Sequence, residues 1–109
     1  GNEKKLQQMV DILLDNGNKY SSAGSRVTLR LQRQNGNRCL LQVSSRGKTL
    51  TSQQCKDIFK RFYRLDQART SSGSYGLGLS IAKQLTERMG GTINAKYQNE
   101  KLIISVFFE

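Results

Sequence analysis

The segment from Gly73 to Leu79, GSYGLGL, constrains this chain most, because its glycines lead straight into a helical pattern. That pattern runs from Leu77 to Met89, and Gly90-Gly91 then supplies a stop. Free backbone N–H groups at a helix start, approached through glycines, form a site for phosphates. The segment is neither a Walker loop, since no Gly-Lys-Ser/Thr follows, nor a dinucleotide fingerprint, since no strand leads directly into it. Alone it fits a flexible lid equally well.

The first half of the chain predicts a helix, a hairpin and a second helix. Apolar residues at three- and four-residue spacing predict a helix over residues 3–20. Alternation predicts a half-buried strand in which Val27, Leu29 and Leu31 face inward, a turn at residues 35–37, and a second strand from Cys39. Thr51 with Gln54 forms a capping box that opens a short helix ending at residue 59.

The second half predicts a long loop over residues 60–75, a third helix and a closing hairpin. The third helix carries Leu77, Ile81 and Leu85 on one stripe. Strands are expected over residues 92–97 and 102–108, with a turn at Asn99-Glu100. This order favours an α+β fold, a two-layer α/β sandwich with the helices on one face of a mostly antiparallel sheet.

Composition sets the broad class. We expect residues 1–109 to form a single domain excised from a longer protein. Hydrophobic residues make up 36%, and no apolar run is long enough to cross a bilayer. The net charge of +10 favours anionic partners without choosing among them. The chain has no histidine and therefore no imidazole base or ligand; Cys39 and Cys55 are expected to be reduced packing residues.

The first helix carries a polar strip. Asn16, Lys19 and Tyr20 stand at i, i+3 and i+4, so they share one side of the helix. An amide oxygen can ligate Mg²⁺, an ammonium can pair with a phosphate, and a phenol can donate to one. The alternative is a solvated helix end whose lysine is favoured by the helix dipole.

Together these segments resemble the ATP-binding catalytic domain of sensor histidine kinases, within the GHKL ATPase superfamily. Residues 15–21, DNGNKYS, resemble the family's asparagine box, and residues 58–66, IFKRFYRLD, its phenylalanine box. Residues 76–83, GLGLSIAK, resemble its second glycine box, and residues 89–93, MGGTI, fit the step into the next strand. The resemblance covers nearly the whole chain and implies the Bergerat fold, with a mixed, mostly antiparallel sheet.

The resemblance also implies roles for individual residues. Asn16 would bind Mg²⁺, Lys19 and Tyr20 would touch the terminal phosphates, and Arg64 would stabilise charge as the γ-phosphoryl group leaves. Lys19 and Arg64 are the implied catalytic residues, with Arg69 a weaker candidate for the task of Arg64. The backbone N–H groups implied to hold the triphosphate of ATP are those of Gly76, Leu77, Gly78 and Leu79. Phe59 and Phe62 are expected to anchor the lid in the core.

The first glycine box departs from the family pattern. The usual Asp-x-Gly-x-Gly is replaced by residues 45–49, SRGKT. Alternation sends Ser45 to the inner face, where the family's aspartate accepts from the adenine amine, and Gly47 is the glycine that remains. Losing a charge-assisted hydrogen bond costs about 1.5–3 kcal/mol. Thr49 replaces a glycine, Ile12 stands where a polar residue is common, and Tyr75 either covers the nucleotide or blocks it.

The implied function is transfer of the γ-phosphate of Mg-ATP to a histidine on a dimerisation domain outside this chain. The implied partners are that dimerisation/histidine-phosphotransfer domain and a response regulator, in a homodimeric full-length protein. The domain alone is expected to be monomeric and cytoplasmic, without nucleic-acid or membrane contact, and the full-length protein to be anchored in the inner or plasma membrane. The alternative is a degenerate, pseudokinase-like module with weak or altered nucleotide binding. A nucleic-acid binder and a serine-phosphorylating anti-sigma relative are less favoured.

Overall fold

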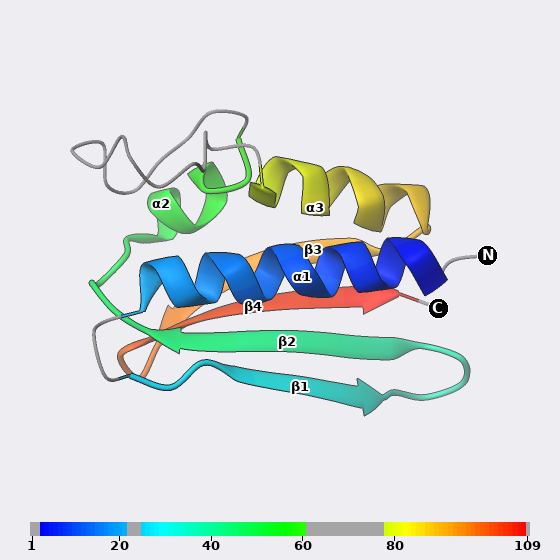
Figure 1. Ribbon diagram of the computed structural model, residues 1–109, viewed down its shortest axis with the longest axis horizontal. Coiled ribbons are helices and arrows are strands. Elements are labelled where there is room, and N and C mark those ends of the chain that lie inside the picture. The colour runs from blue at the N-terminus through cyan, green and yellow to red at the C-terminus, as the bar shows by residue number, and fades with distance from the viewer. Residues whose placement is uncertain (1–2, 22–24, 61–77, 109) are drawn as a thin grey trace.

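The computed structural model describes residues 3–21, 25–60 and 78–108, which contain both helices and strands (Figure 1). Their order is α1, β1, β2, α2, α3, β3, β4. Their bounds are α1 Glu3–Tyr20, β1 Thr28–Arg33, β2 Cys39–Arg46, α2 Ser52–Asp57, α3 Gly78–Arg88, β3 Thr92–Gln98 and β4 Lys101–Phe108. None of the helices in these ranges is both long and apolar enough to cross a membrane.

The strands form one sheet in the order β1-β2-β4-β3, and every pairing among the described residues is antiparallel. Two tight hairpins fix its register. Gly36 has φ 70° in the turn between β1 and β2, and Asn99 and Glu100 have φ 55° and 64° in the turn between β3 and β4. Two successive positive φ values match the right-handed twist of the flanking strands. Both turns were predicted from the sequence and are confirmed.

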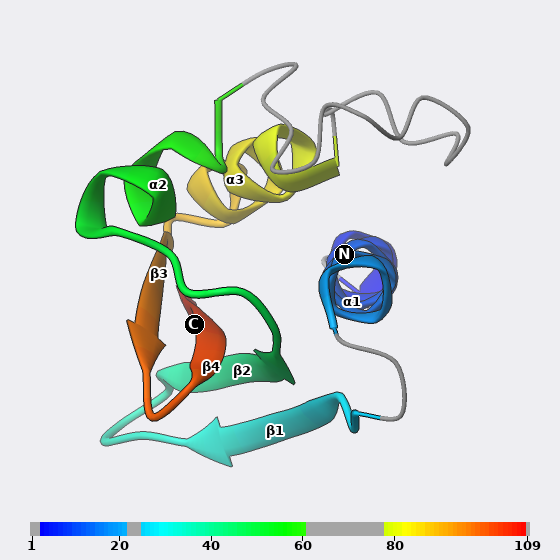
Figure 2. The same ribbon diagram turned by 90° about the vertical axis from the view of Figure 1, so that its left-hand side faces the viewer.

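The helices cover one face of this sheet, so the predicted two-layer α+β fold is confirmed (Figures 1 and 2). α1 and α3 pack against each other as well as on the strands. α1 contributes the fully buried Met9 and Leu13 to the core, and β2 contributes Leu41 and Val43. Burying such side chains supplies most of the driving force that holds the two layers together.

α2 begins at the predicted capping box. The Thr51 Oγ1 accepts from the Gln54 backbone N–H at 3.0 Å, and the Gln54 Oε1 accepts from the Thr51 N–H at 2.9 Å. The helix ends at Asp57, two residues before the predicted end. Ile58 still enters the core and is 4% exposed.

The prediction that β1 is half-buried was wrong. Leu29 is 43% exposed and Leu31 is 63% exposed, although both point to the helix side of the sheet. β1 is an edge strand, and α1 makes most of its contacts with the sheet through β2. The alternating pattern therefore predicted the strand correctly but not its burial, because burial depends on where a helix from a distant part of the chain packs.

The predicted stripe of α3 was right at Leu85 and wrong at Ile81, and Leu77 lies outside the described residues. Its buried side is formed by Leu79, Ala82, Leu85 and Thr86, whereas Ile81 is 36% exposed. Ile81 stands two residues, or about 200°, around the helix from Leu79, so the two cannot share a face. The buried Thr86 hydroxyl donates to the Ala82 carbonyl at 2.8 Å, which satisfies it inside the core.

Candidate functional site

The middle of α1 passes close to the start of α3, and the end of α1 lies against the loop that follows β2. A Cβ added at Gly78, the first residue of α3, would lie 3.5 Å from the Ile12 Cγ2, an ordinary van der Waals contact. Asn16 follows Ile12 by one helical turn on the same side of α1. Ile12 therefore lies close to the start of α3, and Asn16, one turn further along α1, is half-buried.

Lys19 lies one further turn along α1, where its side chain is largely in solvent. Its Nζ pairs with the Asp15 Oδ2 at 3.1 Å, and the two side chains are 40% and 63% exposed. An exposed i,i+4 pair of this kind contributes about 0.3–0.5 kcal/mol. The ammonium can therefore exchange this carboxylate for a phosphate at little cost.

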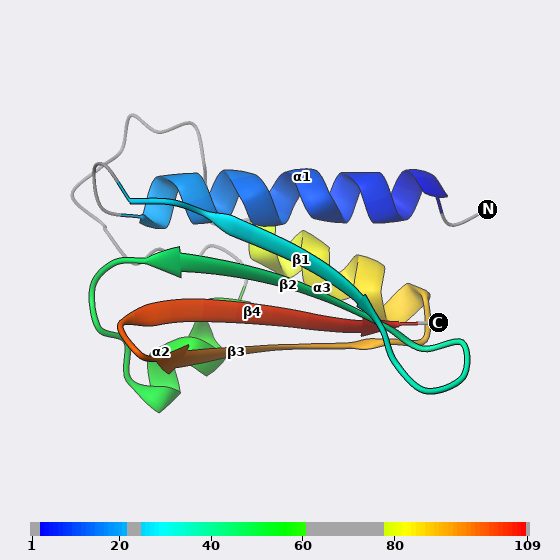
Figure 3. The same ribbon diagram turned by 90° about the horizontal axis from the view of Figure 1, so that it is seen from below.

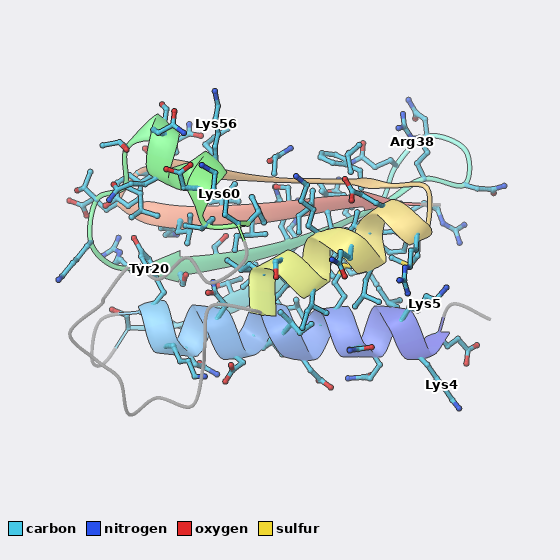
Figure 4. All side chains as sticks on the ribbon, turned by 90° about the horizontal axis from the view of Figure 1, so that it is seen from above. Lys4, Lys5, Tyr20, Arg38, Lys56 and Lys60 are labelled. Atoms are coloured by element: carbon cyan, nitrogen blue, oxygen red, sulfur yellow. The ribbon has the colours of Figure 1, made fainter. Side chains whose placement is uncertain are left out.

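Tyr20, the last residue of α1, is bound to the loop that follows β2 (Figure 4). Its hydroxyl donates to the Lys48 carbonyl. Burial raises the pKa of Tyr20 to about 12, with smaller contributions from Tyr97 and Cys55 nearby. The phenol is therefore neutral at physiological pH, and its proton is engaged by the loop in this structure, away from the phosphate role expected from the sequence.

Gly47 explains why a glycine occupies this loop. A Cβ there would lie 2.7 Å from the Tyr20 Cε2 and 2.8 Å from the Tyr20 backbone oxygen. The second contact is with backbone, so rotating the tyrosine ring cannot relieve it. The loop can pass under Tyr20 because residue 47 has no side chain.

Ser45 is 3% exposed and faces the helix layer, as its strand alternation predicted. Its register partner on β4 is Leu102, and the partner of Leu102 on β3 is Tyr97. The three side chains thus form a row on the inner face. Ser45 therefore contributes a small, neutral and buried hydroxyl to the inner face of the sheet, near the end of β2.

Tyr97 was missed by the sequence reasoning. Its hydroxyl donates to the Gly47 carbonyl at 3.3 Å and accepts from the Thr49 Oγ1 at 3.4 Å. Thr49, the departure from the glycine pattern, therefore helps hold the loop rather than leaving it loose. Inward alternation of Ile93, Ala95 and Tyr97 in the last hairpin was the signal that would have placed Tyr97 here.

Several predicted site residues lie outside the described residues: Arg64, Arg69, Gly76, Leu77, and with them Phe62 and Tyr75. Of the other α3 residues, Leu79 is 8% exposed, so its side chain serves the core while its backbone opens the helix. The half-buried Phe59 packs against the core cluster, as expected for an anchor.

The described residues contain no group of three or more His, Cys, Asp or Glu side chains able to hold a metal ion. Asn16 offers an amide oxygen, which is a ligand type that Mg²⁺ accepts. A Mg²⁺ ion that keeps several waters and takes its remaining ligands from phosphate oxygens fits such a site.

Comparison with known proteins gives one family over nearly the whole chain. The protein-family model described as "Histidine kinase-, DNA gyrase B-, and HSP90-like ATPase" matches residues 1–108. The sensor protein CiaH of Streptococcus pneumoniae is 39% identical over 97 residues, which cover 88% of this chain and 22% of that protein. The chain thus spans about a fifth of the length of this curated relative.

Solved structures give the same fold. The mycobacterial sensor histidine kinase MprB superposes with a TM-score of 0.83 at 29% identity, covering 99% of this chain and 72% of that one. Full-length ShkA in complex with AMPPNP superposes with a TM-score of 0.81 at 22% identity, covering 99% of this chain and 22% of that one. The second likeness, at this identity, speaks for the fold alone.

Proposed function

Because this chain belongs to the family of histidine kinase-, DNA gyrase B- and HSP90-like ATPases, we propose that it is the ATP-binding catalytic domain of a two-component sensor histidine kinase. The reaction is transfer of the γ-phosphate of Mg-ATP to a histidine on a dimerisation domain outside this chain. The supporting observation is the close approach of α3 to α1: a Cβ added at Gly78 would lie 3.5 Å from the Ile12 Cγ2, and Asn16 follows Ile12 by one turn on the same side of α1. An amide ligand and a helix N-terminus on either side of one space suit a triphosphate.

Each group on this side has a separate task in the proposed reaction. The N–H groups of Gly78 and Leu79 hold phosphate oxygens, and Asn16 holds Mg²⁺, which neutralises and orients the phosphates when bound. Lys19 leaves Asp15 and pairs with the terminal phosphates. Arg64 and Arg69, with Gly76 and Leu77, complete the set on the segment between α2 and α3. Phosphoryl transfer needs positioning and charge stabilisation more than a base, so a chain without histidine suffices.

The other side of the proposed pocket takes the base. Ser45 meets the adenine amine with a neutral hydroxyl, and Gly47 gives the backbone room beside it. Tyr20 and Tyr97 keep this loop in place through the Lys48 and Gly47 carbonyls. In this arrangement the Tyr20 hydroxyl holds the loop beside the base. It can contact the phosphates only if its hydrogen bond to the Lys48 carbonyl breaks.

A second candidate is a degenerate module with weak or altered nucleotide binding. The observation that favours it is the burial of Ser45, because a neutral hydroxyl that is 3% exposed offers no charge for the adenine amine. Titrating the chain with Mg-ATP and with Mg-GTP separates the two functions. Equal affinities for both, or none at millimolar nucleotide, would favour the module.

The full-length protein supplies the remaining parts. We propose that its partners are the dimerisation/histidine-phosphotransfer domain and a response regulator. The full-length protein would be a homodimer anchored in the inner or plasma membrane, and residues 1–109 would form one monomeric cytoplasmic domain of it.

The labelled basic side chains do not gather into one surface: Lys4 and Lys5 lie at the start of α1, Arg38 in the first hairpin, and Lys56 and Lys60 around α2 (Figure 4). These five side chains alone therefore do not mark a nucleic-acid interface.

The direct test joins this chain to its native dimerisation helices and follows transfer of the labelled γ-phosphate from ATP. We expect acid-labile label on the dimerisation segment. An otherwise folded protein that binds ATP but transfers no label would contradict the kinase function and leave the binding module.

A further inference from the structure

The face of the sheet away from the helices carries a basic pocket at one end. Its volume is about 380 Å³. The start of β1, the end of β2 and the start of β4 come together at this end (Figure 3). The residues that line it are Ser25, Arg26, Thr28, Ser44, Ser45, Arg46 and Lys101.

Strand register shows that these side chains, except that of Ser45, point away from the nucleotide side. Val27 faces α1, because a Cβ added at Gly17 would lie 3.0 Å from the Val27 Cγ1. Arg26 and Thr28, its neighbours along the chain, therefore point the other way. The buried Ser45 likewise faces the helices, which directs Ser44 and Arg46 outward.

The arrangement of charge in this pocket is unfavourable without a ligand. Arg46 and Lys101 are Cα partners across β2 and β4, so two cations stand directly opposite each other on one face. Like charges in that position destabilise a sheet. The ion pairs among the described residues join Lys19 to Asp15 and Lys60 to Asp57. Within that part of the chain, neither cation of the opposed pair, nor Arg26, has a carboxylate partner.

Hydroxyl groups complete the donor set. Thr28 and Ser44 are also Cα partners, one position further into the sheet on the same face. Their hydroxyls, with that of Ser25, can donate hydrogen bonds to oxygens whose charge the three cations neutralise. None of the lining side chains in the described part of the chain is acidic or apolar, so the pocket selects for an oxyanion with several acceptor atoms.

We propose that this pocket binds a phosphorylated small molecule through a phosphoryl group of at least two negative charges. Its cations and the hydroxyls of Thr28 and Ser44 lie on the opposite face of β2 from the buried Ser45 side chain, and Ser45 is the one residue that the pocket shares with the proposed nucleotide site. The proposed site stands whether or not the chain proves to be a kinase.

Inorganic pyrophosphate is the probe for the test, added to the 109-residue chain while backbone amide NMR signals are followed. Sodium chloride at equal ionic strength controls for screening. We expect saturable shifts at the amides of Ser44, Arg46 and Lys101. Shifts confined to the start of α3, or shifts that do not saturate, would overturn the proposal.

A pair of double variants separates a built site from general attraction to a basic protein. Arg26→Gln with Lys101→Gln removes two pocket cations, whereas Arg30→Gln with Lys96→Gln removes two exposed cations from the same face outside the pocket. We expect the first to weaken pyrophosphate binding about tenfold or more and the second less than about twofold. Equal weakening by both pairs would overturn the proposal. Lys101→Arg, which keeps the charge, is expected to bind as the unmodified chain does.

Discussion

At the scale of single residues, Ser45 decides how this chain would recognise a base. Its side chain is 3% exposed on the inner face of β2, while its neighbour Ser44 points to the opposite face. The position is therefore right for a base contact, and the chemistry is that of a neutral hydroxyl. A carboxylate there would accept from an exocyclic amine with charge assistance.

Ser45→Asp is expected to tighten binding of the non-hydrolysable ATP analogue AMPPNP about tenfold, since one charge-assisted hydrogen bond contributes more than about 1.4 kcal/mol. Calorimetric titration measures the dissociation constant. Ser44→Asp is the matched control, because it adds the same charge to the other face and is expected to change the constant less than about twofold. A folded Ser45→Asp chain that binds no tighter than the Ser44→Asp chain would refute this account of the base site.

The phenol of Tyr20 gives a prediction for pH dependence. Its pKa is about 12 in the folded chain against an ordinary value of 10.0. Between these values the folded state keeps the proton and the unfolded state loses it. The contribution of Tyr20 to the free energy of unfolding is thus complete below pH 10 and is lost as the pH rises towards about 12.

Tyr20→Phe tests this directly, since it removes both the titrating group and its hydrogen bond to the Lys48 carbonyl. At neutral pH we expect the variant to lose about 0.5–1.5 kcal/mol of unfolding free energy in urea. At high pH, stability of the variant should fall less steeply, and the tyrosinate absorbance should lose its last step. Parallel stability curves for the two proteins would show that Tyr20 is not held as described.

At the scale of elements, the loop after β2 is held by two tyrosines from different parts of the fold. Tyr20 binds the Lys48 carbonyl from the end of α1, and Tyr97 binds the Gly47 carbonyl from β3. The loop thus links the helix layer to the far edge of the sheet. Its conformation depends on residue 47 lacking a side chain.

Gly47→Ala is expected to destabilise the chain by about 1–3 kcal/mol, because the new methyl group would meet both the ring and the backbone of Tyr20. Gly78→Ala is the control: its Cβ meets only the Ile12 side chain at 3.5 Å, so the fold should tolerate it. Urea unfolding of the two variants measures the difference. Equal stability would mean that the loop does not pass under Tyr20 as described.

The elements themselves were largely predictable from periodicity and turn chemistry. The capping box of α2 and the two hairpin turns depend on residues a few positions apart, so the sequence displays them directly. The exposure of Leu31 and the buried side of α3 were not predictable in the same way. They depend on α1 lying over β2 rather than β1, which is a contact between segments far apart in the chain.

At the scale of the whole molecule, local sequence patterns mark some residues of the candidate site, whereas only contacts between distant segments mark the others. Asn16, Lys19 and Ser45 were predicted from local patterns and from the order of the boxes, and their roles remain predictions. Tyr97 was not found, because no motif marks it and it joins the site through the β3-β4 register. The Thr49 contact with Tyr97 was hidden for the same reason.

The central claim is that this fold holds a nucleoside triphosphate between the C-terminal half of α1 and the start of α3. The most direct measurement is calorimetric titration of the chain with AMPPNP and Mg²⁺, compared between Lys19→Ala and Lys4→Ala, which lies at the other end of α1 (Figure 4). The account predicts saturable one-to-one binding that Lys19→Ala weakens about tenfold or more, as loss of a charge-assisted contact requires, and that Lys4→Ala leaves unchanged. Absence of binding at millimolar nucleotide, or equal weakening by both substitutions, would contradict it.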